Sequence, residues 1–148
     1  MKTWVLIADA SRARLFQIVR DGRLSLIQEF QFPAGRKRDQ ELVTDKPGSL
    51  KKGLGRSLHS RMPPPTSPHE MAAQNSARDL VRVLHDGWQR GAYEALALVA
   101  PAHFLGLLRE RLDPAISRAL VATLSRDYTA LPDHELTGRL AEHFLPRA

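Results

Sequence analysis

Residues 3–9 read Thr3-Trp4-Val5-Leu6-Ile7-Ala8-Asp9, and the stretch from Trp4 to Ala8 is apolar without a break. A strand with one face in water alternates apolar and polar residues, whereas an unbroken apolar run is typical of a strand buried on both faces. Residues 94–99, Glu94-Ala95-Leu96-Ala97-Leu98-Val99, are a second run of this kind. The two runs indicate buried strands within a sheet.

Two further strands are expected directly after the first. Asp9-Ala10-Ser11 is typical of a turn, and residues 14–20 and 23–32 then suit strands whose side chains alternate between two faces. Asp21-Gly22, between these two segments, is the strongest hairpin signal in the chain. The N-terminal part of the chain therefore predicts a meander of three strands.

A helix is predicted from Ser67, where the chain reads Ser67-Pro68-His69-Glu70. Serine is a preferred N-cap, proline suits the first helical position, and glutamate three residues after the cap closes a capping box. Arg90-Gly91 ends this helix. Its predicted buried face holds Ala73, Ala77, Leu80, Val81, Leu84 and Trp88, and its outer face holds Gln74, Arg78, Arg82 and His85.

The rest of the chain alternates helix and strand. Pro101 opens a second helix, which stops at Asp113-Pro114, and a last helix is expected over residues 132–145. Residues 115–127 fit either a helix or a strand. We expect a short turn followed by a strand over residues 119–124, because alternating helices and strands build a parallel sheet through right-handed crossovers.

The resulting element order is β-β-β-loop-α-β-α-β-α. A meander that feeds two parallel strands predicts an α/β fold of the ribonuclease-H-like type, with three layers around a mixed five-stranded sheet. A chain of 148 residues suits one domain. We therefore expect a single α/β domain over residues 1–148, interrupted by a loop over residues 33–66.

The loop over residues 33–66 is basic, rich in glycine and proline, and without helical or strand periodicity. Loops of this length within a domain are uncommon and are usually functional or disordered. Eight basic residues oppose Asp39, Glu41 and Asp45, so the loop carries 8 − 3 = +5 of the chain's formal charge of +6. The basic residues are Arg36, Lys37, Arg38, Lys46, Lys51, Lys52, Arg56 and Arg61.

Cations spread along a loop favour contact with a polyanion, because each cation that neutralises a phosphate releases a counterion. No aromatic residue lies between Pro33 and Thr66, so stacking on bases is not provided there. Gly53-Leu54-Gly55-Arg56 lacks the lysine–hydroxyl pair of a P-loop, so no nucleotide cofactor is expected. We predict that the eight cations contact a phosphate backbone without sequence choice.

No complete catalytic site is predicted, and no metal. The chain has no cysteine, which excludes thiol nucleophiles and zinc–thiolate sites, and its six histidines lack the spacing of metal ligands. A metal-dependent nuclease is the enzymatic alternative, with Asp9 and Glu70 as ligands, although the fourth strand ends without a carboxylate. We expect Asp9 to bond the backbone of its own turn and Glu70 to serve the helix cap.

Four segments, taken in order, carry a family resemblance: residues 8–16, Asp45-Lys46-Pro47-Gly48 continuing to Arg56 and His59, Ala100-Pro101 with Leu105-Gly106 and Leu108-Arg109, and Arg126-Asp127-Tyr128-Thr129. As an ordered set they resemble the bacterial host-attachment family, whose members are named as required for attachment to host cells. The motif positions in the loop are Asp45, Pro47, Gly48, Gly53, Gly55 and His59.

The resemblance implies kinship with the central domain of archaeo-eukaryotic release factors and Pelota, and hence a ribosome or structured RNA as partner. Release factors carry a Gly-Gly-Gln tripeptide, whereas the corresponding loop here reads Gly53-Leu54-Gly55-Arg56 without glutamine, so peptide release is not carried over. The family name implies an alternative function, a protein–protein interaction module that acts in attachment or its regulation.

Location and assembly are read from what the chain lacks. It shows no signal-peptide apolar region and no apolar stretch long enough to span a bilayer, so we expect a cytoplasmic protein. A homodimer is left open, because the outer strand of the meander is either an exposed edge or covered by the loop.

Overall fold

A computed structural model of the chain describes residues 2–19, 22–33 and 67–141. Five strands and four helices follow one another in these residues. Their bounds are β1 Thr3–Ala8, β2 Arg12–Ile18, β3 Leu24–Gln31, α3 Pro68–Gln89, β4 Ala95–Ala100, α4 Ala102–Arg111, α5 Pro114–Ala119, β5 Leu120–Ser125 and α6 Asp133–Ala141.

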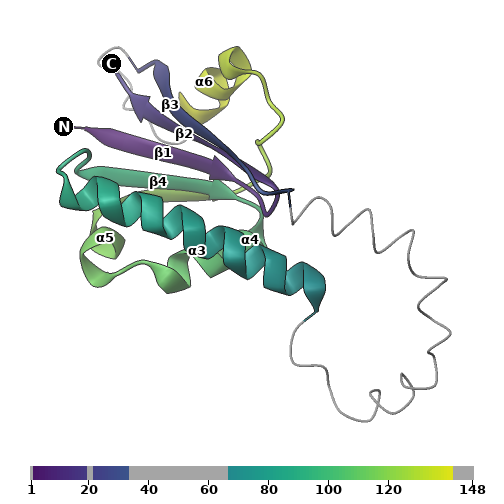
Figure 1. Cartoon of the computed structure of the whole chain (residues 1–148). Coiled ribbons are helices and arrows are strands. Elements are labelled where there is room, and N and C mark those ends of the chain that lie inside the picture. The colour runs from purple at the N-terminus through teal and green to yellow at the C-terminus, as the bar shows by residue number, and fades with distance from the viewer. Residues whose placement is uncertain (1, 20–21, 34–66, 142–148) are drawn as a thin grey trace, which may run out of the picture.

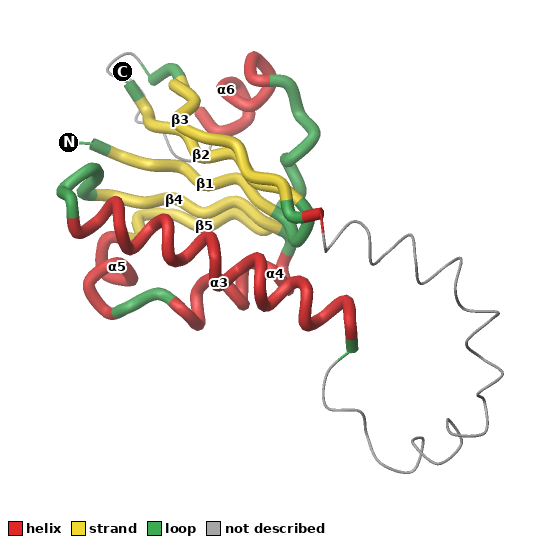
Figure 2. Tube along the Cα trace, viewed as in Figure 1, coloured by secondary structure: helices red, strands yellow, loops and turns green. Residues whose placement is uncertain are grey.

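The strands form one mixed sheet in the order β3-β2-β1-β4-β5 (Figure 2). β2 pairs antiparallel with both β1 and β3, whereas β4 pairs parallel with both β1 and β5. The predicted meander and the two added parallel strands are confirmed, and the fold is α/β with a mixed five-stranded sheet. The ribonuclease-H-like assignment stays a prediction.

The two unbroken apolar runs occupy the centre of this sheet. Every residue of β4 is buried, and so is every residue of β1 after Thr3. Leu6 pairs with Leu98 on one face, and Ile7 pairs with Val99 on the other. Burial on both faces is what the runs predict, and each fully buried leucine or isoleucine stabilises the fold by about 1.5–3 kcal/mol.

Helices cover both faces of the sheet and complete three layers (Figure 1). α3, α4 and α5 lie over one face, where Leu80, Leu108 and Ile116 join the core that contains Leu6 and Leu98. α6 lies over the other face, where its buried residues Leu136 and Leu140 pack with Val5, Ile7, Phe16, Ala97 and Val99. The architecture is therefore helix–sheet–helix.

The prediction is wrong at residues 114–119, which form α5 where we expected a short turn. Asp113 caps this helix, since its Oδ1 accepts a hydrogen bond from the Ile116 amide at 2.9 Å, and Pro114 stands at its N-terminus. The Asp-Pro pair that stops α4 thus also starts α5. The strand predicted over residues 119–124 is confirmed as β5.

Other bounds differ by small amounts. β2 begins at Arg12, two residues before the predicted start, and α6 is described as far as Ala141, so the end predicted at 145 lies outside the described residues. The hairpin turn between β2 and β3 places Gly22 at a φ of 88°, and its amide donates to the carbonyl of Val19 at 2.8 Å. The other turn residue, Asp21, is not described.

The outer strands β3 and β5 expose apolar side chains. Leu26 and Ile27 in β3 are exposed, as is Val121 in β5. Unpaired strand edges with apolar side chains are surfaces on which further chains can pair. Across residues 2–19, 22–33 and 67–141, no helix combines the length and apolar character that crossing a membrane requires.

Trp4 packs against α3 and the segment that leads into β4. Its ring stacks on Tyr93 with the centroids 4.6 Å apart, and the Tyr93 hydroxyl donates to the carbonyl of Leu84 at 2.6 Å. Burial raises the pKa of Tyr93 far above its ordinary value of 10. Gly87 lets the indole lie against α3, because a Cβ there would stand 2.5 Å from Cη2 of Trp4.

Replacing Gly87 by alanine should therefore destabilise the protein despite the better helix propensity of alanine. We expect the free energy of unfolding to fall by about 1–3 kcal/mol, because the new methyl group overpacks against Trp4. Gly106→Ala in α4 is the matched control, since a Cβ at Gly106 meets nothing within 4 Å. Urea unfolding should show the control to be as stable as the parent or up to about 1 kcal/mol more stable. Equal changes in the two variants would contradict this packing.

Candidate functional site

The carboxyl ends of β1, β4 and β5 meet at one edge of the sheet, which we call the carboxyl edge. In open α/β sheets, ligands bind beyond the carboxyl ends of the strands. The end of β3 and the start of α3, which flank the predicted basic loop, both lie on this side of the sheet (Figure 1). The eight predicted cations and the six loop-motif residues lie within residues 34–66, outside the described residues, so their placement stays a prediction.

Asp9 ends β1 at this edge and organises the turn that follows. Its Oδ1 accepts hydrogen bonds from the amides of Ser11 at 2.8 Å and Arg12 at 2.9 Å. Its own amide donates to the carbonyl of Arg12 at 2.9 Å. The expectation that Asp9 bonds the backbone of its own turn is confirmed, and the turn starts β2 in register beside β1.

The same turn holds the elements on either side of the basic loop. The amide of Phe32, at the end of β3, donates to the carbonyl of Ser11 at 2.8 Å. The buried Ser76 hydroxyl of α3 donates to the carbonyl of Ala10, also at 2.8 Å. The strand that enters the loop and the helix that follows it are therefore both tied to residues 10–11.

The second oxygen of Asp9 links β1 to the segment after β5. Oδ2 lies 3.1 Å from the hydroxyl of Thr129, and that hydroxyl lies 2.8 Å from Oδ1 of Asp127. A hydroxyl has one proton, so Thr129 donates to only one of the two carboxylates at a time. Sequence reasoning missed this link; the only signal was the family motif at residues 126–129, which assigned it no role.

Arg14 in β2 fixes the same segment from the other side. Its Nη2 donates to the carbonyls of Tyr128, Thr129 and Leu131 at 3.2, 3.0 and 2.6 Å, and its Nη1 pairs with Oδ1 of Asp133 at 3.0 Å. The Arg14 side chain is only 15% exposed. A planar guanidinium can serve several acceptors at once, and a lysine cannot reproduce this geometry.

The start of α3 holds Glu70, the second carboxylate considered as a metal ligand. The predicted cap is confirmed, because the Ser67 hydroxyl accepts from the Glu70 amide at 3.0 Å. The Glu70 carboxylate does not complete the predicted capping box. It accepts from Nε2 of Gln74 at 3.1 Å and lies 2.7 Å from Nε2 of His103, the second residue of α4. The pair joins the first turns of α3 and α4.

Hydrogen bonds from Gln74, and then from His103, lower the pKa of Glu70 below its ordinary 4.5. The carboxylate is thus held in its charged form by a neutral partner, Gln74, and a basic partner, His103. Asp9 is likewise engaged by its turn and by Thr129. In the part of the chain that the structure describes, no three His, Asp or Glu side chains gather in a way that could hold a metal ion.

Comparison with known proteins identifies the family to which the chain belongs. The profile of one protein family matches residues 4–140. The chain belongs to this family, described as "Protein required for attachment to host cells". The resemblance read from the ordered motifs is thereby confirmed. No match was found among curated proteins.

Two solved structures are similar to this member of the host-attachment family. An archaeal translation termination factor is 11% identical, with a TM-score of 0.50 over 97% of this chain and 35% of its own. An archaeal protein is 12% identical, with a TM-score of 0.49 over 96% of this chain and 34% of its own. The chain spans about a third of the length of each. At 11% identity, the likeness to the termination factor concerns the fold alone.

Removing the guanidinium of Arg14 tests its part in shaping the carboxyl edge. Arg14→Met should lower the free energy of unfolding by about 2–3 kcal/mol, because partly buried carbonyls of residues 128–131 lose their donor. Asp133→Asn is the control: its carboxylate is 67% exposed, so its loss should cost less than about 1 kcal/mol. Similar losses for both variants in thermal or urea unfolding would show that the carbonyl contacts do not hold the segment.

The environment of Glu70 predicts a pH effect. A pKa lowered by folding means that this carboxylate stabilises the folded state above the unfolded-state value near 4.5, and that this contribution is lost as the pH falls through the lower folded-state value. Carbon-detected NMR titration should place the pKa of Glu70 below 4.5. Gln74→Ala should raise it more than His103→Ala does, because the Gln74 bond is the larger cause. A pKa that neither variant moves would contradict the bonding shown.

Proposed function

We propose that this host-attachment family protein is a non-catalytic, cytoplasmic binding protein that contacts RNA, on the ribosome or alone, through the basic loop over residues 33–66. The observation that carries the proposal is where the charge lies. The described residues hold 12 Lys or Arg and 11 Asp or Glu, which is a net +1. The loop carries +5 of the chain's +6. The folded body is nearly neutral, and the cations concentrate in one segment.

The position of this segment supports the proposal. Its flanking elements are tied to the turn at residues 10–11, on the side of the sheet where α/β folds present ligand sites. A rigid sheet edge with a cationic segment attached suits phosphate contact, which needs charge at spaced positions rather than a shaped pocket. The shared fold of a translation termination factor makes the ribosome the first particle to test.

The case against catalysis rests on how the polar groups at the carboxyl edge are used. Asp9 bonds its turn and Thr129, Glu70 bonds Gln74 and His103, and Arg14 bonds backbone carbonyls and Asp133. Each of these groups joins one element to another. The metal-dependent nuclease is therefore the weaker proposal, and activity with magnesium or manganese that is lost in Asp9→Ala would revive it.

A second candidate is a protein–protein interaction module that acts in attachment or its regulation. The family description points to it, and so do the apolar side chains on the two outer strands, with Val121 in β5 being 63% exposed. A partner that adds a strand to β5 or β3 would cover them, and a second copy of the chain would form a homodimer in the same way. Binding of this kind barely responds to salt, which separates it from the RNA proposal.

The charge proposal is tested by RNA affinity over a salt series. Affinity for a structured RNA and for ribosomes should fall steeply with salt, by roughly 10³–10⁵ between about 50 and 200 mM if six or more cations contact phosphates. Neutralising all eight loop cations to glutamine should abolish this dependence.

Two variants that remove the same charge provide the control. Arg36, Lys37 and Arg38→Gln changes three loop cations, whereas Arg90, Arg109 and Arg118→Gln changes three exposed cations of the folded body. The loop variant should flatten the slope of log affinity against log salt by about 0.7–0.9 for each phosphate that the loop no longer neutralises, and the body variant should not. Equal slopes in both would show non-specific charge attraction and overturn the proposal, as would no binding at low salt.

A further inference from the structure

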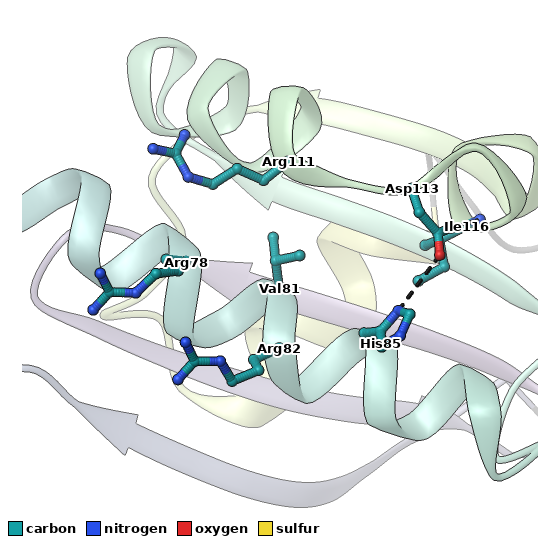
Figure 3. Close-up of a pocket in the computed structure, with 7 residues that line it drawn as sticks. All are labelled: Arg78, Val81, Arg82, His85, Arg111, Asp113 and Ile116. Atoms are coloured by element: carbon teal, nitrogen blue, oxygen red, sulfur yellow. Dashed lines mark hydrogen bonds and ion pairs between the residues drawn. The ribbon is translucent and has the colours of Figure 1, made fainter.

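A groove lies on the outer side of the helical layer, between α3 and the corner where α4 passes into α5 (Figure 3). Its volume is about 360 Å³, which falls within the range of about 300–1,000 Å³ for small-molecule sites. It exists because α4 ends at Arg111 and the chain turns through Leu112 and Asp113 before α5 begins. None of its lining residues belongs to the loop over residues 33–66 or is one of the carboxyl-edge groups Asp9, Arg14, Glu70 and Thr129. Its lining residues are Arg78, Val81, Arg82, His85, Arg111, Asp113 and Ile116.

The α3 wall comes from one helical stripe. Arg78, Val81, Arg82 and His85 stand at i, i+3, i+4 and i+7, a spacing that places side chains on the same face of a helix. The sequence prediction put the three polar members of this stripe on an outer, solvated face and Val81 in the core. Val81 is half-buried: it packs against the core, as predicted, and its side chain also lines the groove between the helices (Figure 3).

Three guanidinium groups dominate one end. In Figure 3, those of Arg78, Arg82 and Arg111 are directed to the same side of the view. Their ion pairs are long: Arg78 and Arg82 share Oδ1 of Asp79 at 3.6 and 3.9 Å, and Arg111 lies 3.9 Å from Oε1 of Glu110. Strong charge-assisted N–H···O bonds are about 2.7–2.9 Å. The neighbouring carboxylates thus leave most of the donor capacity of Arg78 and Arg82 available to a ligand. Nη1 of Arg111 also donates to the carbonyl of Leu107 at 3.3 Å, so Arg111 offers its remaining N–H groups.

At the other end of the groove, Asp113 and His85 pair with each other. Oδ2 of Asp113 lies 3.4 Å from Nδ1 of His85, while Oδ1 of Asp113 caps α5 (Figure 3). The one acid in the lining is therefore committed to a helix cap and to a histidine. Between the two ends, the half-buried Val81 supplies apolar surface, and the fully buried Ile116 lies beneath the lining beside Asp113 (Figure 3).

We propose that this groove binds a small organic oxyanion, a phosphate or carboxylate joined to an apolar body. The anionic group lies among Arg78, Arg82 and Arg111, where guanidinium forks match the geometry of phosphate and carboxylate oxygens. The apolar body lies along Val81 and ends at the His85–Asp113 pair. Charge alone would accept any hydrated anion, whereas the apolar wall favours an anion that carries hydrocarbon.

The test uses four probes of matched chemistry on the full chain: hexyl phosphate, hexanoate, inorganic phosphate and hexanol. We expect hexyl phosphate or hexanoate to shift the amide NMR signals of residues 78–85 and 111–116. Inorganic phosphate and hexanol should each bind at least about tenfold more weakly than the better organic anion. Inorganic phosphate lacks the apolar body, and hexanol lacks the anionic group. The better of the two organic anions identifies the head group.

Two variants and one control locate the site. Arg78→Gln with Arg82→Gln should weaken binding of the organic anion about tenfold or more through loss of charge-assisted bonds. Val81→Phe should weaken it by filling the groove without changing the charge. Arg118→Gln removes an exposed cation of α5 outside the groove and should leave affinity unchanged. Circular dichroism establishes that each variant is folded.

Three outcomes overturn the proposal. The first is that no probe shifts these residues at millimolar concentration. The second is that inorganic phosphate binds as tightly as hexyl phosphate, which reduces the site to a charged surface. The third is that the folded groove variants bind as the parent does. None of these outcomes bears on RNA binding by residues 33–66, so this proposal and the proposed function stand or fall separately.

Discussion

The parallel pairing of β1 with β4 is the constraint on which the rest of the structure depends. Both strands are apolar along their length and buried on both faces, so neither face of the sheet centre can be left in water. Helices are therefore required on both sides, and α3 with α4 and α5 covers one face while α6 covers the other. Polar residues are excluded from the sheet centre, and they collect where the parallel strands end.

At that edge, single polar side chains hold several segments together. Asp9 shapes the turn after β1 and reaches Thr129, Arg14 secures the backbone of residues 128–131, and Ser76 ties α3 to Ala10. Asp9 and Glu70, the two carboxylates considered as metal ligands, both accept hydrogen bonds from neighbouring groups of the fold. Contacts at this edge also hold the elements on both sides of the loop over residues 33–66, since Phe32 bonds Ser11 and Ser76 bonds Ala10. The loop itself contributes most of the net charge.

Periodicity predicted what depends on local pattern: both buried strands, the hairpin, the Ser67 cap and the helix–strand order. It could not predict contacts between residues far apart in the chain, such as those from Arg14 to the carbonyls of residues 128–131. Residues 115–127 suited either a helix or a strand, and burial of Ile116 against the core favoured the helix α5 at their start. The groove between α3 and the α4–α5 corner was missed for the same reason. Cations spaced along one face of α3 indicate a solvated face in the sequence, and only the structure shows that the α4–α5 corner lies opposite them.

The central claim is that the chain meets its partner through its basic segment rather than through its folded body. The chain has five lysines, and four of them, Lys37, Lys46, Lys51 and Lys52, lie in that segment, whereas Lys2 lies beside β1. Lysine acetylation footprinting with and without ribosomes therefore carries its own internal reference. The account predicts that the four loop lysines become protected while Lys2 reacts as before. Protection of Lys2 alone, or equal reactivity of all five in the presence of saturating ribosomes, would contradict it.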